Sequence, residues 1–148
     1  MDNSSALLAG TGIMMLVITV LGIMLIPVIF YLLTIQRTLE KCSVASRAMS
    51  PGMVWLMLLP LFGQIWHFFI VLNTAKSLAA EFNSRGIAVP EPEPGKGIGL
   101  AMCISSCCTI IPVLGALAGL AFLVLWIMYW IKIADYSKQL NLPVATTY

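Results

Sequence analysis

The chain has 148 residues, of which 60% are hydrophobic and only 9% are charged, and its formal net charge is +2. Soluble domains usually carry about 25% charged residues, so this composition indicates one membrane domain over residues 1–148, with the lipid bilayer as its first partner. The eight Lys and Arg residues are too scattered to neutralise several neighbouring phosphates, which excludes a nucleic-acid-binding surface.

The first predicted element is a transmembrane helix over residues 9–33. These residues carry no charge, and a helix of this length rises about 37 Å, more than the hydrocarbon core of about 30 Å. The preceding leader has no Lys or Arg, whereas a cleavable signal peptide begins with a basic segment, so we expect the helix to be retained. We expect the polar connection that follows to form a short interfacial helix that stops before Pro51.

The second apolar segment, residues 51–73, is interrupted by the sequence PLFG. It is predicted either to re-enter the membrane, with Pro60 and Gly63 at the apex of a hairpin, or to span the membrane with a kink at Pro60. Residues 74–86 have apolar side chains at helical spacing and predict an amphipathic helix. The alternating Pro and Glu of residues 87–97 predict an extended linker.

The third apolar segment covers residues 98–133, and a continuous helix over its apolar residues 98–131 would rise about 51 Å, far more than a membrane needs. We therefore predict a membrane hairpin whose apex contains Pro112 and Gly115, followed by a tail over residues 134–148. The apex sequence PVLG resembles PLFG, and each follows an apolar arm and precedes a Trp-containing arm. This similarity indicates an internal repeat.

Together these elements predict an all-α integral membrane protein with one N-terminal transmembrane helix and two membrane hairpins broken at Pro-x-x-Gly. The alternative is a four-span bundle with a kink at Pro60. Hairpins that enter from the cytoplasm keep all eight basic residues inside, whereas the four-span bundle divides them five to three, so the positive-inside rule favours the hairpins. We therefore expect a multi-pass protein of a cell membrane, the bacterial inner membrane, with a cytoplasmic C-terminus.

Small residues form a stripe on the helix predicted before the second apex, and the stripe continues after that apex. Steps of three and four residues place its members on one helix face, and small side chains let membrane helices approach closely. We therefore predict helix packing, and contacts with further copies of the chain or with other membrane subunits, at Gly97, Ala101, Ser105, Cys108, Gly115 and Gly119.

The cysteines of this region are a candidate thiol or metal site, which the helix geometry weakens. Cys103 and Cys107 share a face opposite Cys108. A zinc site usually takes four ligands, and one continuous helix cannot direct these three thiols to one ion. We therefore expect no metal and no cofactor, and a thiol- or metal-binding membrane protein stays as an alternative.

A candidate polar pathway consists of Gln64, His67 and Asn73 in the second apolar segment. These side chains either line a path or bond to backbone groups freed by Pro60 or to a neighbouring helix. No Asp or Glu lies well inside an apolar segment, and the single His has no neighbouring acid, which argues against a proton relay and against hydrolysis. We expect no catalytic residues and a non-enzymatic protein that oligomerises or serves as an accessory or scaffold subunit; a small oligomeric channel or transporter is the alternative.

Overall fold

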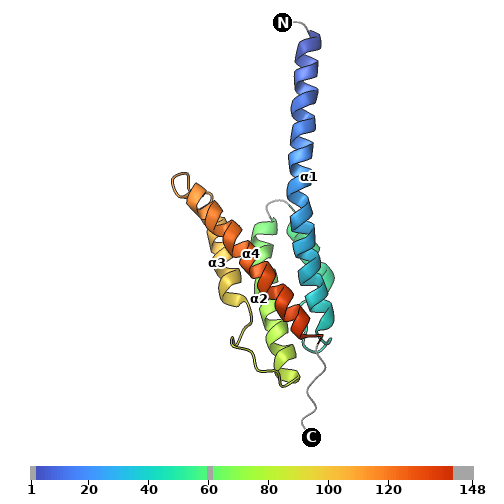
Figure 1. Cartoon of the computed structure of the whole chain (residues 1–148), viewed down its shortest axis with the longest axis vertical. Coiled ribbons are helices and arrows are strands. Elements are labelled where there is room, and N and C mark those ends of the chain that lie inside the picture. Colours follow the sequence, from blue (N-terminus) through green and yellow to red (C-terminus); the bar gives the residue numbers. More distant parts are fainter. Residues whose placement is uncertain (1–2, 60–61, 142–148) are drawn as a thin grey trace. The chain divides into compact units, whose positions relative to one another are not determined.

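The computed structural model describes residues 3–59 and 62–141, apart from the side chains of residues 3–6 and 9. These residues form α1 (Asn3–Lys41), the 3-10 helix η1 (Pro51–Leu58), α2 (Phe62–Ser84), α3 (Lys96–Cys108) and α4 (Gly115–Gln139) (Figure 1). All the elements of the described residues are helices and none is a strand, so the all-α prediction is confirmed. The predicted apex residue Pro60 lies outside the described residues.

The chain divides into two compact units, residues 1–33 and residues 34–148, and the boundary lies inside α1. Two helices are long and apolar enough to cross a membrane, Gly10–Lys41 in α1 and Gly115–Gln139, which is α4. In the most apolar stretch of α1 no residue is buried, and in that of α4 only 11% are, whereas the core helix of a soluble protein is mostly buried. This exposure favours an apolar solvent around both helices.

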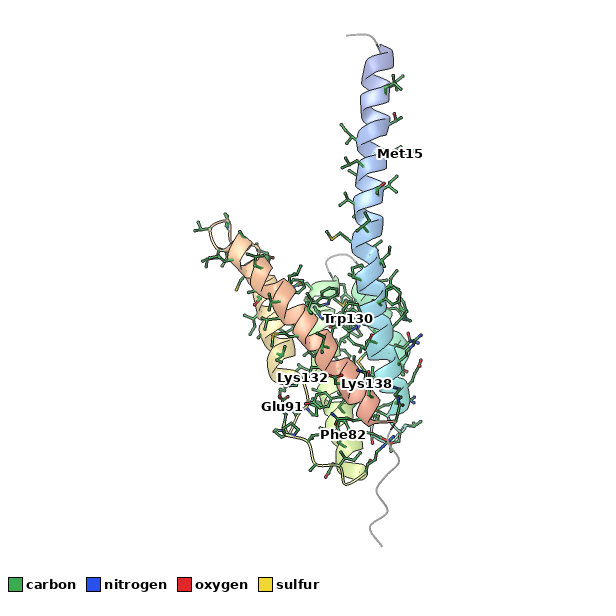
Figure 2. All side chains as sticks on the ribbon, in the orientation of Figure 1. Met15, Phe82, Glu91, Trp130, Lys132 and Lys138 are labelled. Atoms are coloured by element: carbon green, nitrogen blue, oxygen red, sulfur yellow. The ribbon has the colours of Figure 1, made fainter. Side chains whose placement is uncertain are left out.

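Unit 1 consists of the first part of α1, whose apolar side chains point outward around the helix, as Figure 2 shows near Met15. Its two threonines need no outside partner, because each hydroxyl donates to a carbonyl of its own helix. The Thr19 hydroxyl lies 2.8 Å from the Met15 carbonyl oxygen, and the Thr11 hydroxyl lies 3.0 Å from that of Leu7. These two hydroxyl groups therefore need no hydrogen bonds from the surrounding solvent.

In unit 2, α3 and α4 pack side by side as an antiparallel pair joined by residues 109–114, and α2 packs on α3 (Figure 1). The 3-10 helix η1 packs on α2. The core lies between these helices and the end of α1. Phe82 of α2 and Tyr136 of α4 meet edge to face with ring centroids 5.7 Å apart, and the other large buried apolar residues include Ile35, Leu39, Ile70, Leu78, Met102 and Ile133.

Three tryptophans fasten the elements of unit 2 to one another through their indole N–H groups. Trp66 of α2 donates to the Met53 carbonyl of η1 at 2.8 Å. Trp55 of η1 donates to the side chain of Gln36 at 2.7 Å, and Trp130 of α4 donates to the Thr34 hydroxyl at 2.9 Å. Each indole thus combines apolar burial with one directional bond, and η1 and α4 are both tied to the end of α1.

The two Pro-x-x-Gly segments share one backbone feature. A Cβ on Gly63 would lie 2.1 Å from the Met57 carbonyl oxygen, and a Cβ on Gly115 would lie 2.8 Å from the Thr109 carbonyl oxygen. In both segments the glycine meets the carbonyl six positions before it. Only glycine permits such an approach, so the same local geometry recurs at both positions and supports the internal repeat.

The predicted amphipathic residues 74–86 are mostly the second half of α2, because no Gly or Pro interrupts the chain between Gln64 and Ser84. The connection after α1 differs from the one expected. No separate interfacial helix forms before Pro51; instead α1 continues to Lys41. A hydrogen bond of 2.9 Å from the Gln36 amide to the Glu40 carboxylate supports this last turn.

Gly99 provides the sharpest test of the packing in unit 2. A Cβ there would lie 2.4 Å from a Val71 methyl carbon and 2.9 Å from the Tyr129 ring. We expect Gly99→Ala to lower the free energy of unfolding by about 1–3 kcal/mol, the usual cost of overpacking a core. Circular dichroism of denaturant unfolding in detergent micelles measures this change. Gly97→Ala is the matched control, because a Cβ there meets no atom within 4 Å; equal stability of the two variants would contradict the packing.

Candidate functional site

The polar end of unit 2 is organised around the side chain of Arg85, just after α2. Its Nη1 donates to the Leu140 carbonyl at 2.8 Å, and its Nη2 donates to the Lys41 carbonyl at 3.2 Å. These carbonyls belong to the ends of α4 and α1, where carbonyls lack partners within the helix and carry partial negative charge. One guanidinium therefore holds the C-terminal ends of three helices together.

Glu81 of α2 balances this charge and is only 3% exposed. Its Oε1 accepts the Arg85 Nε–H at 2.7 Å, and its Oε2 accepts the backbone N–H and the hydroxyl of Ser43 at 2.8 and 2.9 Å. Burial is the largest single influence on the Glu81 pKa and raises it. The hydrogen bonds from Ser43, Arg85 and Ser46 together outweigh burial and lower the pKa to about 2.

Two further cations satisfy carbonyls at the same end. Lys41 donates its Nζ protons to the carbonyl and the hydroxyl of Ser137 in α4, at 2.9 and 2.8 Å. Arg47 donates to the carbonyls of Cys42 and Glu40, at 2.9 and 2.8 Å, and so closes the end of α1. Positive charge at helix C-termini is stabilising, so these cations serve the fold.

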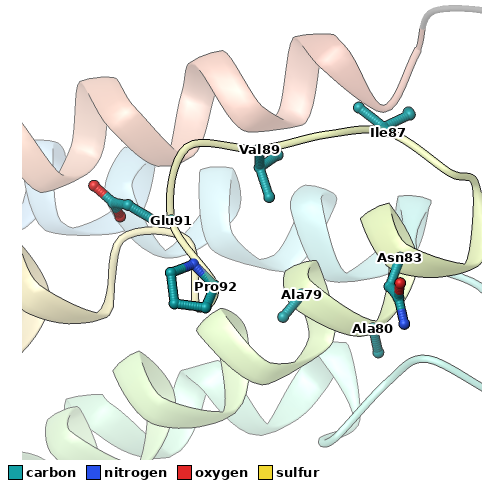
Figure 3. A pocket seen from close by; sticks show the side chains of 7 residues that line it. All are labelled: Ala79, Ala80, Asn83, Ile87, Val89, Glu91 and Pro92. Atoms are coloured by element: carbon teal, nitrogen blue, oxygen red, sulfur yellow. The ribbon is translucent and has the colours of Figure 1, made fainter.

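The linker between α2 and α3 is fixed by its glutamates. Glu91 pairs with Lys132 of α4 and accepts the Gly95 N–H at 2.9 Å, and these bonds lower its pKa (Figure 2). Glu93 pairs with Lys96. Between the linker and the outer face of α2 lies an open pocket of 410 Å³ (Figure 3), lined by Ala79, Ala80, Asn83, Ile87, Val89, Glu91 and Pro92. Its one carboxylate is already engaged, so this pocket is not assigned a ligand.

The predicted small-residue stripe faces outward from unit 2, while the adjacent face of α3 enters the core. The buried residues of α3 are Gly99, Met102 and Cys103. Gly115 of the predicted set lies at the turn against Thr109, and added Cβ atoms at Gly97 and Gly119 would meet nothing. The outward, fully or partly exposed members are Gly97, Ala101, Ser105, Cys108 and Gly119.

The three residues of the candidate polar pathway have different surroundings. Gln64 donates to the Ser106 hydroxyl of α3 at 2.8 Å, and Asn73 donates to the Phe69 carbonyl of its own helix at 2.8 Å. His67 is buried. None of the three pockets described in unit 2 is lined by these residues. Gln64 thus forms a hydrogen bond to a neighbouring helix. This is one of the two interpretations given above, the other being a side chain that lines a path.

The three cysteines of α3 differ in burial. Cys103 is buried, Cys107 is exposed and Cys108 is intermediate, and all are free thiols. Within residues 3–59 and 62–141, no group of three or more His, Cys, Asp or Glu side chains is arranged to hold a metal ion. Comparisons with protein-family models, curated proteins and solved structures give no match for the chain.

Sequence reasoning missed the cluster around Arg85. Its one local signal is the spacing of Glu81 and Arg85, four residues apart on one helix, which predicts an ion pair. The partners Ser43 and Lys41 come from a segment that is distant in sequence. Only the fold brings them to the end of α2.

Glu81→Gln tests whether this cluster stabilises unit 2. At neutral pH we expect the free energy of unfolding to fall by about 3–5 kcal/mol, because the variant leaves the guanidinium without its buried counter-charge. A carboxylate with a lowered pKa stabilises the fold above its unfolded pKa, and this contribution disappears as the pH falls from about 4.5 towards 2. The difference between wild type and variant should therefore shrink over that range.

Thermal unfolding in detergent, followed from pH 7 to about 2, measures both effects. Asp135→Asn is the control, since the pair that Asp135 forms with Lys138 is exposed and exposed pairs contribute at most about 1 kcal/mol. A Glu81→Gln variant as stable as Asp135→Asn would show that the cluster contributes little.

Proposed function

We propose that the chain is a non-enzymatic integral membrane protein that assembles laterally, with further copies of itself or as an accessory or scaffold subunit of a membrane complex. The observation that carries this proposal is the division of the exposed surface. Large apolar side chains are exposed along residues 10–30 and along α4 as far as Ile131, while the described charged residues all lie within residues 34–141. Such extensive apolar exposure suits lipid and lateral partners.

Contacts at the polar end favour the hairpin topology over the four-span bundle. The Ser43 N–H donates to Glu81 at 2.8 Å, and the Ala48 N–H donates to the Ser77 hydroxyl at 2.9 Å. In the four-span bundle, the connection that contains Ser43 and the end of α2 lie on opposite sides of the membrane. Direct bonds between them support a common side, with η1 and the start of α2 as a re-entrant hairpin.

The turn between α3 and α4 has the character of a segment that ends inside hydrocarbon. Its side chains include Ile110 and Val113, which are 80% and 87% exposed, and it contains no charged residue. The backbone N–H groups of residues 109–111 donate to carbonyls of α3 at 3.1–3.4 Å, and Pro112 has no N–H. Backbone groups satisfied in this way are the condition for irregular structure at membrane depth.

The charge distribution supports a cytoplasmic polar end. All eight Lys and Arg residues lie within residues 34–141, and the positive-inside rule assigns such a segment to the cytoplasm. The C-terminus is then cytoplasmic as well. Two helices are long and apolar enough for a membrane, and we propose a protein of a cell membrane, the bacterial inner membrane, in which α1 spans the bilayer and α4 is one arm of a membrane hairpin.

The outward stripe on α3 and α4 supports lateral assembly. Its glycines, Gly97 and Gly119, leave open space next to the backbone. Without a hydrophobic force between helices in lipid, close backbone approach at small residues is a principal source of association. This surface is therefore the proposed contact with a second copy or another subunit.

The topology is tested with impermeant thiol reagents on sealed cells. Single cysteines replace Ser4, Val44, Ser84 or Lys138 in a chain without its native cysteines, because Ser46 and Ser137 are buried whereas Val44 and Lys138 are exposed. The hairpin topology predicts that only Ser4→Cys is labelled from outside, because the polar end is cytoplasmic. Labelling of Val44→Cys alone would instead establish the four-span bundle and remove the re-entrant hairpin.

Assembly is tested with Gly119→Leu and Ala101→Leu. Each substitution adds bulk to the outward stripe, and we expect the oligomer to dissociate at least partly while the folded content stays the same. Sedimentation or cross-linking in mild detergent measures the assembly, and circular dichroism measures the fold. Leu120→Ala is a control on the exposed part of α4 that removes bulk. Unchanged oligomer size in both Leu variants would contradict this surface.

A further inference from the structure

We infer that a groove of unit 2, between the linker, α3 and α4, binds the headgroup of a zwitterionic phospholipid whose phosphate is joined to a primary ammonium group. Such a site depends on the membrane location proposed above. It is compatible with the hairpin topology and with the four-span bundle, because both place the linker and the end of α4 on the same side of the membrane.

This linker groove has a volume of 540 Å³, within the range of about 300–1,000 Å³ that is usual for small-molecule sites. It is lined by two carboxylates and two ammonium groups, together with apolar side chains of α3. The charged residues are Glu91, Glu93, Lys96 and Lys132, and the apolar ones include Ile98 and Leu100. The groove therefore offers both signs of charge next to an apolar surface.

The linker groove lies where the apolar surface of α3 and α4 begins. Lys96 and Lys132 are separated by 97–131, a stretch without any charged residue. On α4 the exposed apolar residues end at Ile131, directly before Lys132. Trp126 and Trp130 lie close to this level, and tryptophans concentrate where hydrocarbon meets the headgroups. In a membrane, the two lysines are therefore placed at the level of the lipid headgroups.

Two rows of apolar side chains lead from the lysines toward the turn between α3 and α4. Steps of four residues from Lys96 and from Lys132 define the rows, so each row follows one helix face. The rows consist of Leu100 and Ile104 on α3 and of Met128 and Val124 on α4. Leu100 is partly exposed, and the other three side chains are 48–56% exposed. Acyl chains can lie along these rows while their headgroup occupies the groove.

The charges of the linker groove match a zwitterion. Glu91 pairs with Lys132, and Glu93 pairs with Lys96 (Figure 2), so the four charges cancel. An anionic headgroup would add a negative charge that nothing in the groove balances. A phosphate joined to an ammonium group adds one charge of each sign, with the phosphate next to the lysines and the ammonium next to the glutamates.

The two ion pairs leave capacity for these additional bonds. An ammonium group has three N–H donors and a carboxylate has about four acceptor positions, whereas each of the two lysines pairs with one glutamate. The side chains of Lys96 and Glu93 are also 39% and 33% exposed. The pocket next to α2 differs in this respect, because its lining contains one carboxylate and no cation.

Lipid retention measured by native mass spectrometry tests the site. The full-length chain is reconstituted into vesicles of phosphatidylethanolamine, phosphatidylcholine and phosphatidylglycerol in equal parts and with the same acyl chains. It is recovered by flotation and transferred to mild detergent. We expect several-fold more retained phosphatidylethanolamine than either other lipid, because the choline group has no N–H and phosphatidylglycerol has no ammonium. Equal retention of the three, or a preference for another of them, would overturn the assignment.

Glu93→Gln and Lys96→Gln test the two charges separately. Glu93→Gln leaves one excess positive charge in the groove, so the preference should shift several-fold toward phosphatidylglycerol. Lys96→Gln removes a phosphate partner and should lower the retention of both lipids several-fold. The matched controls are Asp135→Asn and Lys138→Gln, because this exposed pair has the same three-residue spacing and lies outside the groove. Circular dichroism verifies the fold of each variant. An unchanged preference in a folded Glu93→Gln variant would contradict the site.

The same experiment separates this site from the membrane location on which it depends. A chain that does not float with the vesicles refutes the membrane location, whereas a chain that floats and retains the three lipids equally refutes the site alone. Glycerophosphoethanolamine has the headgroup without acyl chains. At equal concentration it should not displace the retained lipid, because it makes no contact with the apolar rows. Displacement would overturn the assignment to a lipid.

Discussion

One guanidinium determines the arrangement of unit 2. Arg85 bonds to carbonyls at the ends of α1 and α4 while it extends from the end of α2, so three helices must finish at the same level. The start of α4, and with it the turn of residues 109–114, is thereby directed to the opposite end. Burying this charge is costly unless it is fully paired, and Glu81, itself held by Ser43, supplies the pairing. The polar end is therefore a cluster whose members depend on one another.

The helical class and the main chain breaks follow from local chemistry. Apolar segments of spanning length predict α1 and α4, and a Pro and a Gly within six residues predict the turn before Gly115. The same reasoning places a linker where Pro and Glu alternate. These features depend on residues that are close together in the sequence. Such local patterns can be read directly from a single sequence.

Other features depend on contacts between distant segments and could not be predicted in this way. Helix periodicity identified two faces of α3 but could not say which of them enters the core; Gly99 decides it, because Val71 and Tyr129 pack against its backbone. Likewise, Gln64 was recognised as a polar residue in an apolar segment, but its partner Ser106 is 42 positions away. Nothing in the sequence near Lys41 or Leu140 predicts that the Arg85 side chain bonds to the carbonyls of both residues.

The glycine approach at the two turns has a consequence for how such hairpins diverge. At Gly63 and at Gly115 the constraint is a missing Cβ facing a backbone carbonyl, and it is indifferent to the side chains on either arm. The arms are then free to lengthen, to exchange a 3-10 helix for an α-helix, or to replace every apolar residue with another. Such a bend is preserved while the sequence of the two arms diverges. A common origin of the two hairpins would then be visible only in their Pro-x-x-Gly segments.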